Sequence, residues 1–245
     1  MAKKKSNQNK ICFKYGCGGW CVIFEKNGLN GNTLKIIAML TMLIDHIGVI
    51  LFPQNAILKI IGRISMPIYA YLISEGCLYT QNKLRRFLQI FALGAGCQIV
   101  YFVVEKDFQL NILLSFSVSI LLCYLALLVK KQKINVVYLI FALIAVYHIL
   151  EFLKDYKISF DYGFYGILLP VLIILPNNYY EKFITAILGV ALLSFKIGGI
   201  QWWSLMALIP IALYNGQKGK HNIKYVFYAF YPIHIVVIYL IKLVL

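Results

Sequence analysis

The sequence predicts an all-α, polytopic membrane protein, built as a bundle of about nine transmembrane helices. Hydrophobic residues make up 61% of the 245 residues and charged residues only 13%, against ~25% charged in ordinary soluble domains. The mean hydropathy is +0.78, and apolar runs long enough to cross a hydrocarbon core of ~30 Å recur along the chain. These observations exclude a disordered chain, a soluble nucleic-acid-binding protein and a conventional secreted domain.

The basic excess is interpreted against a membrane rather than a nucleic acid. Lys and Arg number 24 and Asp and Glu number 9, which gives a net charge of +15. We expect no nucleic-acid partner, because basic residues in a membrane protein set its orientation and attract anions. Residues 1–31 are expected to form a basic tail that contains Gly and Cys, and residues 32–245 a single integral membrane domain.

The cysteines and the start of the chain add little chemistry. Cys12, Cys17 and Cys21 have no His nearby, and their spacing matches no standard zinc site. The other three lie in apolar runs, where Cys behaves as a small hydrophobic residue: Cys77, Cys97 and Cys123. We therefore expect reduced thiols and no metal. The basic start is not followed by a clean apolar segment with a cleavage site, so we expect no signal peptide.

Polar breaks divide the chain into nine apolar runs. The longer runs cover residues 34–52, 57–79, 84–104, 110–129, 134–153 and 223–245. Three shorter runs cover residues 162–175, 183–195 and 200–214 and contain Gly or Pro. Short spans with Gly or Pro are typical of tilted or broken helices around a cavity.

The basic residues predict the orientation of these helices. With the N-terminus in the cytoplasm, the cytoplasmic side receives 17 Lys and Arg residues and the outer side 6. This bias satisfies the positive-inside rule. We expect a multi-pass protein of the cell (plasma or inner) membrane, with lipid around it, its N-terminus inside and its C-terminus outside.

Asp45 and Arg63 lie at similar depths in the first and second runs. Each is about 10 Å from the outer boundary when counted at about 1.5 Å per residue. Because consecutive helices are antiparallel, this depth predicts contact between the two side chains. A structural ion pair and an active-site role are equally compatible with the pattern, since an arginine inside the membrane needs a counter-charge or an anionic ligand.

Lys35 and His46 share one face of the first helix. Their separation of 11 residues corresponds to three turns plus about 20°. Lys35 at the cytoplasmic mouth and His46 about 16 Å deeper could line a tunnel for a long anionic molecule. Spacing alone favours a plainer interpretation, a lysine that reaches the membrane surface and a histidine hydrogen-bonded within the bundle.

The last run carries Tyr231, Pro232 and His234 at a depth close to that of Asp45 and His46. Pro232 is expected to kink this helix beside His234, and Tyr231 shares a face with His234. Polar groups at one depth, drawn from both ends of the chain, indicate a common site. His148 has no such company and is expected to be structural.

Two further polar groups lie near the ends of spans. Glu75 is expected near the cytoplasmic boundary, in an interfacial ion pair with one of three basic residues: Lys83, Arg85 and Arg86. Gln201 opens the eighth run beside two tryptophans, at the predicted outer interface. No Gly-rich phosphate loop, serine-nucleophile motif or HExxH motif is present.

Five segments together resemble the TraX family of conjugal-transfer membrane proteins. They are LKIIAMLTMLIDHIG, IGRISMPIYAYLISEG with Thr80, DYGFYGILL, QWWSLMALIPIALYNGQKG and FYAFYPIH. Their order and spacing carry the resemblance, which runs from about Leu34 to the C-terminus. The member that gives the family its name is associated with N-terminal acetylation of pilin, and Lys35-x10-His46 is also similar to the R/K-x10-H motif of membrane acyltransferases.

The resemblance implies an acetyl-CoA-dependent acetyltransferase and an acyltransferase-like membrane domain. It favours His46 as the general base, with acetylation of His46 itself left open and His234 as the alternative base. Cytoplasmic basic residues would attract the CoA phosphates, although the same charges serve topology equally: Lys35, Arg85, Arg86, Lys218 and Lys220. Asp45 is expected to fix Arg63, which stabilises the thioester oxyanion, or to orient His234. Acceptor contacts are expected from three residues: Tyr231, Glu75 and Gln201.

Two other classes of function stay open at this point. A secondary transporter also places ionisable groups at mid-depth and uses short, broken helices. A scaffold for export or assembly in a conjugation or secretion system needs neither His46 nor Arg63. The acceptor (a peptide amine, a sugar hydroxyl or a lipid) and the oligomeric state are left open by the sequence.

Overall fold

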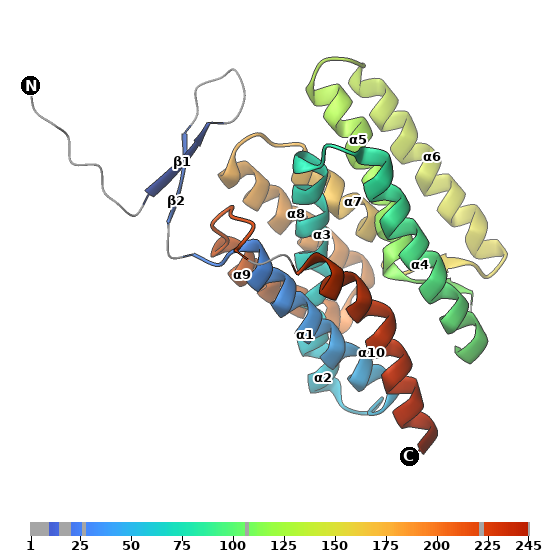
Figure 1. Cartoon of the computed structure of the whole chain (residues 1–245). Coiled ribbons are helices and arrows are strands. Elements are labelled where there is room, and N and C mark those ends of the chain that lie inside the picture. The colour runs from blue at the N-terminus through green and yellow to red at the C-terminus, as the bar shows by residue number, and fades with distance from the viewer. Residues whose placement is uncertain (1–9, 15–20, 26–27, 106–107, 221–222, 245) are drawn as a thin grey trace, which may run out of the picture.

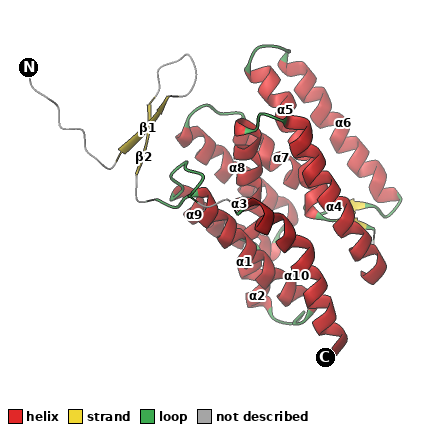
Figure 2. Cartoon of the chain, viewed as in Figure 1, coloured by secondary structure: helices red, strands yellow, loops and turns green. Residues whose placement is uncertain are grey.

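The computed structural model is an almost entirely helical bundle (Figures 1 and 2). It describes residues 10–14, 21–25, 28–105, 108–220 and 223–244. The helices are α1 (Gly31–Ile50), α2 (Ala56–Gly62), α3 (Ser65–Tyr79), α4 (Lys83–Glu105), α5 (Ile112–Lys130), α6 (Val136–Asp155), α7 (Gly163–Ile174), α8 (Tyr179–Ile197), the 3-10 helix η1 (Gly199–Ala207), α9 (Leu208–Ala212) and α10 (Lys224–Val244). Strands β1 (Lys10–Lys14) and β2 (Cys21–Glu25) pair antiparallel, and β3 (Gln109–Leu110) and β4 (Ser159–Phe160) pair parallel.

Every predicted apolar run contains helix, and the all-α class is confirmed. Within the described residues, 6 helical segments are long and apolar enough to cross a membrane: Gly31–Ile50, Ala56–Tyr79, Lys83–Val103, Ile112–Lys130, Val136–Asp155 and Val226–Val244. The predicted short runs correspond to α7, α8 and the continuous segment Gly199–Ala212. The chain is therefore a membrane protein of several spans, while nine spans and the orientation of the termini stay predictions.

Asparagine side chains fix where five of the described helices begin. The side-chain oxygens of Asn30, Asn55, Asn82, Asn111 and Asn135 accept backbone N–H groups in the first turns of α1, α2, α4, α5 and α6 respectively. The first N–H groups of a helix have no partner within it, so such a cap removes an unsatisfied donor. This placement explains why these helices start just after a polar break in the sequence.

The second predicted span is divided into α2 and α3 at Arg63 and Ile64. Pro67 lacks the N–H that would bond to the carbonyl four residues earlier, at Arg63, and its ring clashes with that carbonyl in a regular helix. At the same break the Ser65 hydroxyl donates to the Gly62 carbonyl, at 2.8 Å. The break therefore places Arg63 at the junction of α2 and α3.

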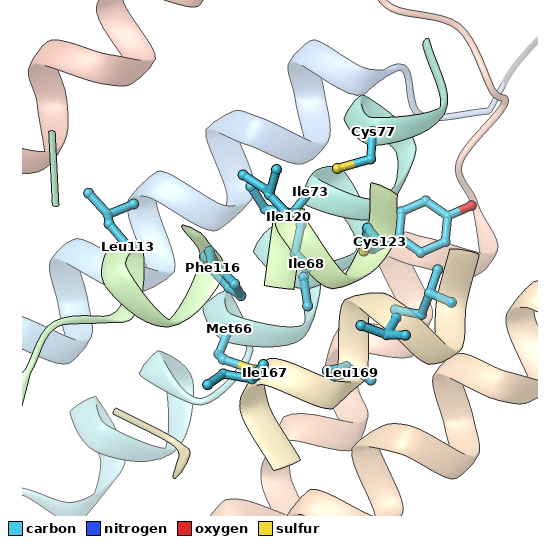
Figure 3. Packing of buried hydrophobic residues seen from close by; sticks show 14 of the residues in the cluster. Met66, Ile68, Ile73, Cys77, Leu113, Phe116, Ile120, Cys123, Ile167 and Leu169 are labelled. Atoms are coloured by element: carbon cyan, nitrogen blue, oxygen red, sulfur yellow. The ribbon is translucent and has the colours of Figure 1, made fainter. Parts of the chain in front are cut away.

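The core of the bundle lies around α3, α5 and α7 (Figure 3). Ile68 of α3, Ile120 of α5 and Ile167 of α7 are fully buried. On α6, by contrast, only Leu139 and Leu150 are buried. Ala142, Leu143 and Val146 pack against the core with part of their surface. Most of the other apolar side chains of α6 are exposed, and in a membrane these side chains are expected to contact lipid.

The two ends of the membrane region meet in the folded chain. Helix α1 packs against α2, α3 and α10, and α10 also packs against α4. Figure 1 shows α10 beside α1, with α4 on the other side of α10. The expected common site between the first and last helices therefore has a structural basis.

Candidate active site

His46 of α1 and His234 of α10 face each other. His46 Nδ1 lies 3.1 Å from His234 Nε2, and the ring centroids are 4.9 Å apart. His234 is buried, and His46 is partly buried. The two histidines of the first and last spans therefore lie together, as expected, and their common functional site stays a prediction.

The surrounding hydrogen bonds determine which ring nitrogens carry protons. His234 Nδ1 lies 2.7 Å from the carbonyl oxygen of Phe230, which can only accept, so this nitrogen is the donor. His46 Nδ1 lies 3.0 Å from the Met42 carbonyl and is a donor for the same reason. In the neutral rings both Nε2 atoms then hold lone pairs. His46 Nδ1–H is shared between Met42 and His234 Nε2.

Two tyrosines complete the histidine site. The hydroxyl of Tyr101, from α4, lies 3.2 Å from His46 Nε2 and donates to it. The buried Tyr231 ring meets the His46 ring edge-on, with centroids 6.5 Å apart, and the Tyr231 side chain hydrogen-bonds to Tyr101. Tyr231 was predicted on the site face of α10. Tyr101 was not predicted, because an aromatic residue in the apolar run QIVYFVVE has no distinguishing sequence signal.

The predicted contact between Asp45 and Arg63 is present. Arg63 Nη2 lies 3.1 Å from Asp45 Oδ1, and these side chains are 20% and 17% exposed. Gly62 permits the approach, because a Cβ at this position would collide with the Asp45 carboxyl group. The helix junction and the glycine together bring the carboxylate against the guanidinium.

Arg63 has a second partner that the sequence pattern did not identify. Its Nη1 donates to the Tyr162 hydroxyl at 3.3 Å. Tyr162 has a left-handed backbone with φ of 59°, a conformation that is strained for a bulky residue and occurs at functional sites. The segment DYGFYG contributed to the family resemblance, and the structure gives its tyrosine a specific contact.

Asp161, next to Tyr162, links the ion pair to the histidine site. Burial raises the pKa of the Asp161 carboxyl to about 7; Arg63 acts to lower this pKa and Asp45 to raise it. The same carboxyl interacts electrostatically with Tyr101 and Tyr231. The two groups of polar residues are therefore neighbours in one site.

The segment that carries Asp161 is held by backbone contacts. Its N–H donates to the Leu110 carbonyl at 2.9 Å, and its carbonyl accepts from the Ser115 hydroxyl at 3.0 Å. Strands β3 and β4 pair immediately before it. This anchoring positions Asp161 and Tyr162 at the start of α7.

The two roles left open for Asp45 can be compared in the structure. The Asp45 carboxylate pairs with Arg63, whereas His234 is oriented by the Phe230 carbonyl and by His46. The geometry therefore favours Asp45 as the residue that fixes Arg63. It also favours His46 as the base, because His234 Nε2 is directed at the other histidine.

Lys35 lies on the predicted face of α1. Its ammonium group stands 5.7 Å from the centroid of Phe227 on α10, the helix that His46 also meets. The predicted shared face of Lys35 and His46 is thereby confirmed as the face toward α10. The loop before α10 covers the start of α1, where the Gly31 N–H donates to the Gln217 carbonyl at 2.6 Å.

The other predicted CoA ligands differ in their surroundings. Lys218 and Lys220 are exposed in the loop that covers the start of α1, and Arg85 is exposed on α4. Arg86 instead lies against α3, where Gly76 leaves room for its guanidinium and Nη2 donates to the Ile73 carbonyl at 3.5 Å. Lys218 and Lys220 thus share the Lys35 end of α1, whereas Arg86 is engaged in packing.

The prediction that Glu75 forms an ion pair with Lys83, Arg85 or Arg86 is wrong. Glu75 Oε1 pairs with Lys182 Nζ at 2.9 Å, and these side chains are 10% and 9% exposed. Lys83, Arg85 and Arg86 lie in the first turn of α4, whereas Glu75 on α3 pairs with a residue of α8. The sequence places those three residues closer along the chain, but the helix face decides the contact. A buried ion pair of this kind accounts for Glu75 without a substrate.

Gln201 and His148 differ in burial: Gln201 is buried and His148 is exposed. Gln201, placed beside the exposed Trp202 and Trp203, is itself buried, and neither amide atom of its side chain has a hydrogen-bond partner. Its amide group is therefore still able to donate and accept hydrogen bonds. His148 is exposed on α6 with its ring edge against Tyr147, and its structural role stays a prediction.

Comparison with known proteins adds a family and two relatives. The chain is 24% identical over 238 residues to a probable fimbrial assembly protein, FimC of serogroup H1, from Dichelobacter nodosus, with 82% of this chain and 91% of the relative covered. It is 35% identical over 106 residues to an uncharacterized protein of Rickettsia prowazekii (strain Madrid E), with 42% of this chain and 40% of that protein covered. No solved structure matches the chain. The family model described as TraX protein matches residues 30–242, and the chain belongs to the TraX family.

Proposed function

We propose that this TraX-family protein is a membrane-embedded acetyltransferase of envelope assembly. It moves an acetyl group from cytoplasmic acetyl-CoA to a peptide N-terminus or another envelope acceptor. The observation that carries the proposal is the state of His46: hydrogen bonds from Nδ1 leave Nε2 as its one basic ring atom, beside Tyr101. This is the arrangement that a general base requires.

His46 and His234 divide the work of proton transfer. His46 Nε2 accepts the acceptor's proton, and the positive charge that forms on the ring is stabilised where Nδ1–H donates to His234 Nε2 and the Met42 carbonyl. His234 acts here as an orienting acceptor, in the position that a carboxylate occupies in a serine-hydrolase triad. The proton later passes from His46 to the departing thiolate.

Arg63 supplies positive charge where the oxyanion develops. Its charge acts on His46, and its orientation is set by Asp45 on one nitrogen and Tyr162 on the other. A fixed guanidinium in a partly buried site stabilises an oxyanion more than a mobile one does, because no reorganisation is needed during the reaction.

Acetyl-CoA supplies the activated thioester, and the chain offers residues that suit it at the predicted cytoplasmic end. Lys35, Lys218 and Lys220 provide positive charge around the start of α1 for the CoA phosphates. From Lys35 to His46 the helix rises about 16 Å along the face that α10 covers. A long, mainly uncharged arm suits this direction.

The test is a transfer assay combined with mass analysis of cells. Purified protein in lipid should consume acetyl-CoA and release free thiol in the presence of an envelope extract. Peptides and envelope glycans from cells with the gene should carry one acetyl increment that is absent without it. Protein that is folded and inserted but neither consumes thioester nor changes any mass would contradict the proposal.

A non-catalytic role in fimbrial assembly is the second candidate, because the relative from Dichelobacter nodosus bears the name of an assembly protein. A scaffold needs correct folding but no base. Cells that carry inserted His46→Ala protein and assemble surface fibres normally, without acetyl transfer, would favour the scaffold. Coupled substrate uptake by the purified protein would favour a secondary transporter.

A further inference from the structure

We propose that Tyr101 is a further catalytic residue, whose hydroxyl carries the acceptor's proton to His46. The inference rests on the proposed acetyl transfer and deepens it. His46 has one basic ring nitrogen, Nε2, and the Tyr101 hydroxyl lies 3.2 Å from it and donates to it. The acceptor therefore reaches Nε2 either by displacing Tyr101 or through its oxygen.

The hydrogen bonds favour transfer through the oxygen. A tyrosine hydroxyl has one donor and two acceptor sites. The donor is directed at His46 Nε2, and Tyr231 hydrogen-bonds to the same hydroxyl. One acceptor site of the Tyr101 oxygen then stays available for an N–H or O–H group of the acceptor. Displacement would break both of these contacts.

The hydrogen bonds of these side chains also form a series in which every donor is oriented in the same direction. Tyr101 O–H donates to His46 Nε2, His46 Nδ1–H donates to His234 Nε2, and His234 Nδ1–H donates to the Phe230 carbonyl. A proton that enters at Tyr101 thus meets a lone pair at each following nitrogen. Tyr101 is partly exposed, whereas His234 is buried. The acceptor can therefore reach this series of hydrogen bonds at Tyr101.

The proposed step balances in atoms and charge. The acceptor's nitrogen or oxygen bonds to the thioester carbonyl carbon as its proton moves to the Tyr101 oxygen. The Tyr101 proton moves at the same time to His46 Nε2, so Tyr101 stays neutral and His46 becomes an imidazolium. Collapse of the tetrahedral intermediate breaks the carbon–sulfur bond. The thiolate of CoA takes the proton from His46, and acetylated acceptor and free CoA result.

The test replaces Tyr101 with Phe, which removes the hydroxyl and keeps the ring. We expect kcat to fall about 10²-fold, at the lower end of the range for loss of a proton-transfer group. The KM for acetyl-CoA should stay unchanged, because Tyr101 does not bind that substrate. Tyr124→Phe is the matched control: its hydroxyl donates to the Lys83 carbonyl at 3.3 Å, at the opposite end of α4. This variant should keep the full rate.

Rates in mixtures of light and heavy water separate a relay from a packing role. Two protons move together in the wild-type step, so its rate should depend on the deuterium fraction along a curve. In Tyr101→Phe one proton moves, and the dependence should become linear. A Tyr101→Phe variant with the wild-type rate or the wild-type curve would overturn the relay. A faster variant would show that Tyr101 is displaced by the acceptor.

A spectroscopic measurement tests the hydrogen bond without acetyl-CoA. The chain has 4 histidines, so ring nitrogen-15 signals in lipid nanodiscs can be assigned by substitution. In Tyr101→Phe the His46 Nε2 signal should move toward that of a bare nitrogen, while Nδ1 stays protonated. An unchanged signal would also overturn the inference. If wild-type protein transfers no acetyl group, the proposed function fails and the relay fails with it; if only the Tyr101→Phe results fail, acetyl transfer by His46 stands.

Discussion

His46 and His234 are separated by 188 positions in the sequence, and their ring nitrogens lie 3.1 Å apart. The contact joins the first long helix to the last. Because each Nδ1 is held by a backbone carbonyl one turn earlier, the two rings are ordered in one sense, with His46 as donor and His234 as acceptor. Their roles in catalysis should therefore be unequal.

The first prediction is a graded loss of activity at the two histidines. His46→Ala should lower kcat by about 10²–10⁴-fold, since general-base catalysis contributes that much. His46→Gln should be nearly as damaged, because an amide cannot accept the proton. His234→Ala should lose less, and His234→Gln should recover part of that loss, because its side-chain oxygen can accept from His46 Nδ1–H.

His148→Ala is the control for these variants. It removes an exposed imidazole from α6 and should change neither kcat nor thermal stability. Transfer rates and melting temperatures in the same detergent measure both quantities. Full activity of folded His46→Ala protein would remove His46 from the mechanism, and a complete loss in His234→Ala alone would exchange the two roles.

The second prediction concerns Gly62. In Gly62→Ala the new methyl group meets the Asp45 carboxyl, so the contact of Asp45 with Arg63 must open. We expect a loss of about 1–3 kcal/mol in stability, as for other overpacked sites, together with a lower kcat. Gly96→Ala on α4 is the control, because no atom lies within 4 Å of a Cβ there. Equal behaviour of the two variants would show that the Asp45 contact has no consequence.

The third prediction is a pH dependence that belongs to Asp161. Burial raises its pKa from 3.8 to about 7 in the folded protein. Between these values the folded state holds a proton that the unfolded state has lost, so stability should fall as the pH rises from about 4 to about 7 and then level off. In Asp161→Asn this contribution should be absent. Melting temperatures at half-unit pH steps compare the two proteins, and parallel curves would contradict the assignment.

The helices could be predicted from the sequence because their signals are local. Apolar runs of membrane length and asparagines at their starts locate α1, α5 and α6 closely. The division of the second run at Arg63 was not predicted. It depends on Pro67, whose effect appears four residues earlier, and the Ser65 hydroxyl donates to the Gly62 carbonyl at the same break.

The site could be predicted only where charge or histidine marked it. Asp45, Arg63, His46 and His234 stand out because ionisable groups are costly inside a membrane. Tyr101 does not, since tyrosine is common in apolar runs and only the fold brings it to His46. The partner of Glu75 was missed because the helix face and the packing of α8, rather than distance along the chain, select Lys182.

The last prediction separates CoA binding from topology at the predicted cytoplasmic end. Lys218→Gln with Lys220→Gln should raise the KM for acetyl-CoA and weaken its dependence on salt, because exposed charges attract the phosphates over a screened distance. The kcat should stay unchanged, since neither residue reaches His46.

Lys131→Gln with Lys133→Gln is the matched control. It removes the same charge from another exposed loop on the same predicted side and should leave the KM unaltered. Arg86→Gln should instead lower thermal stability, because it removes the contact with the Ile73 carbonyl. Equal KM values for both double variants in correctly inserted protein would mean that Lys218 and Lys220 serve orientation alone, and the CoA site would then have to be sought around Lys35.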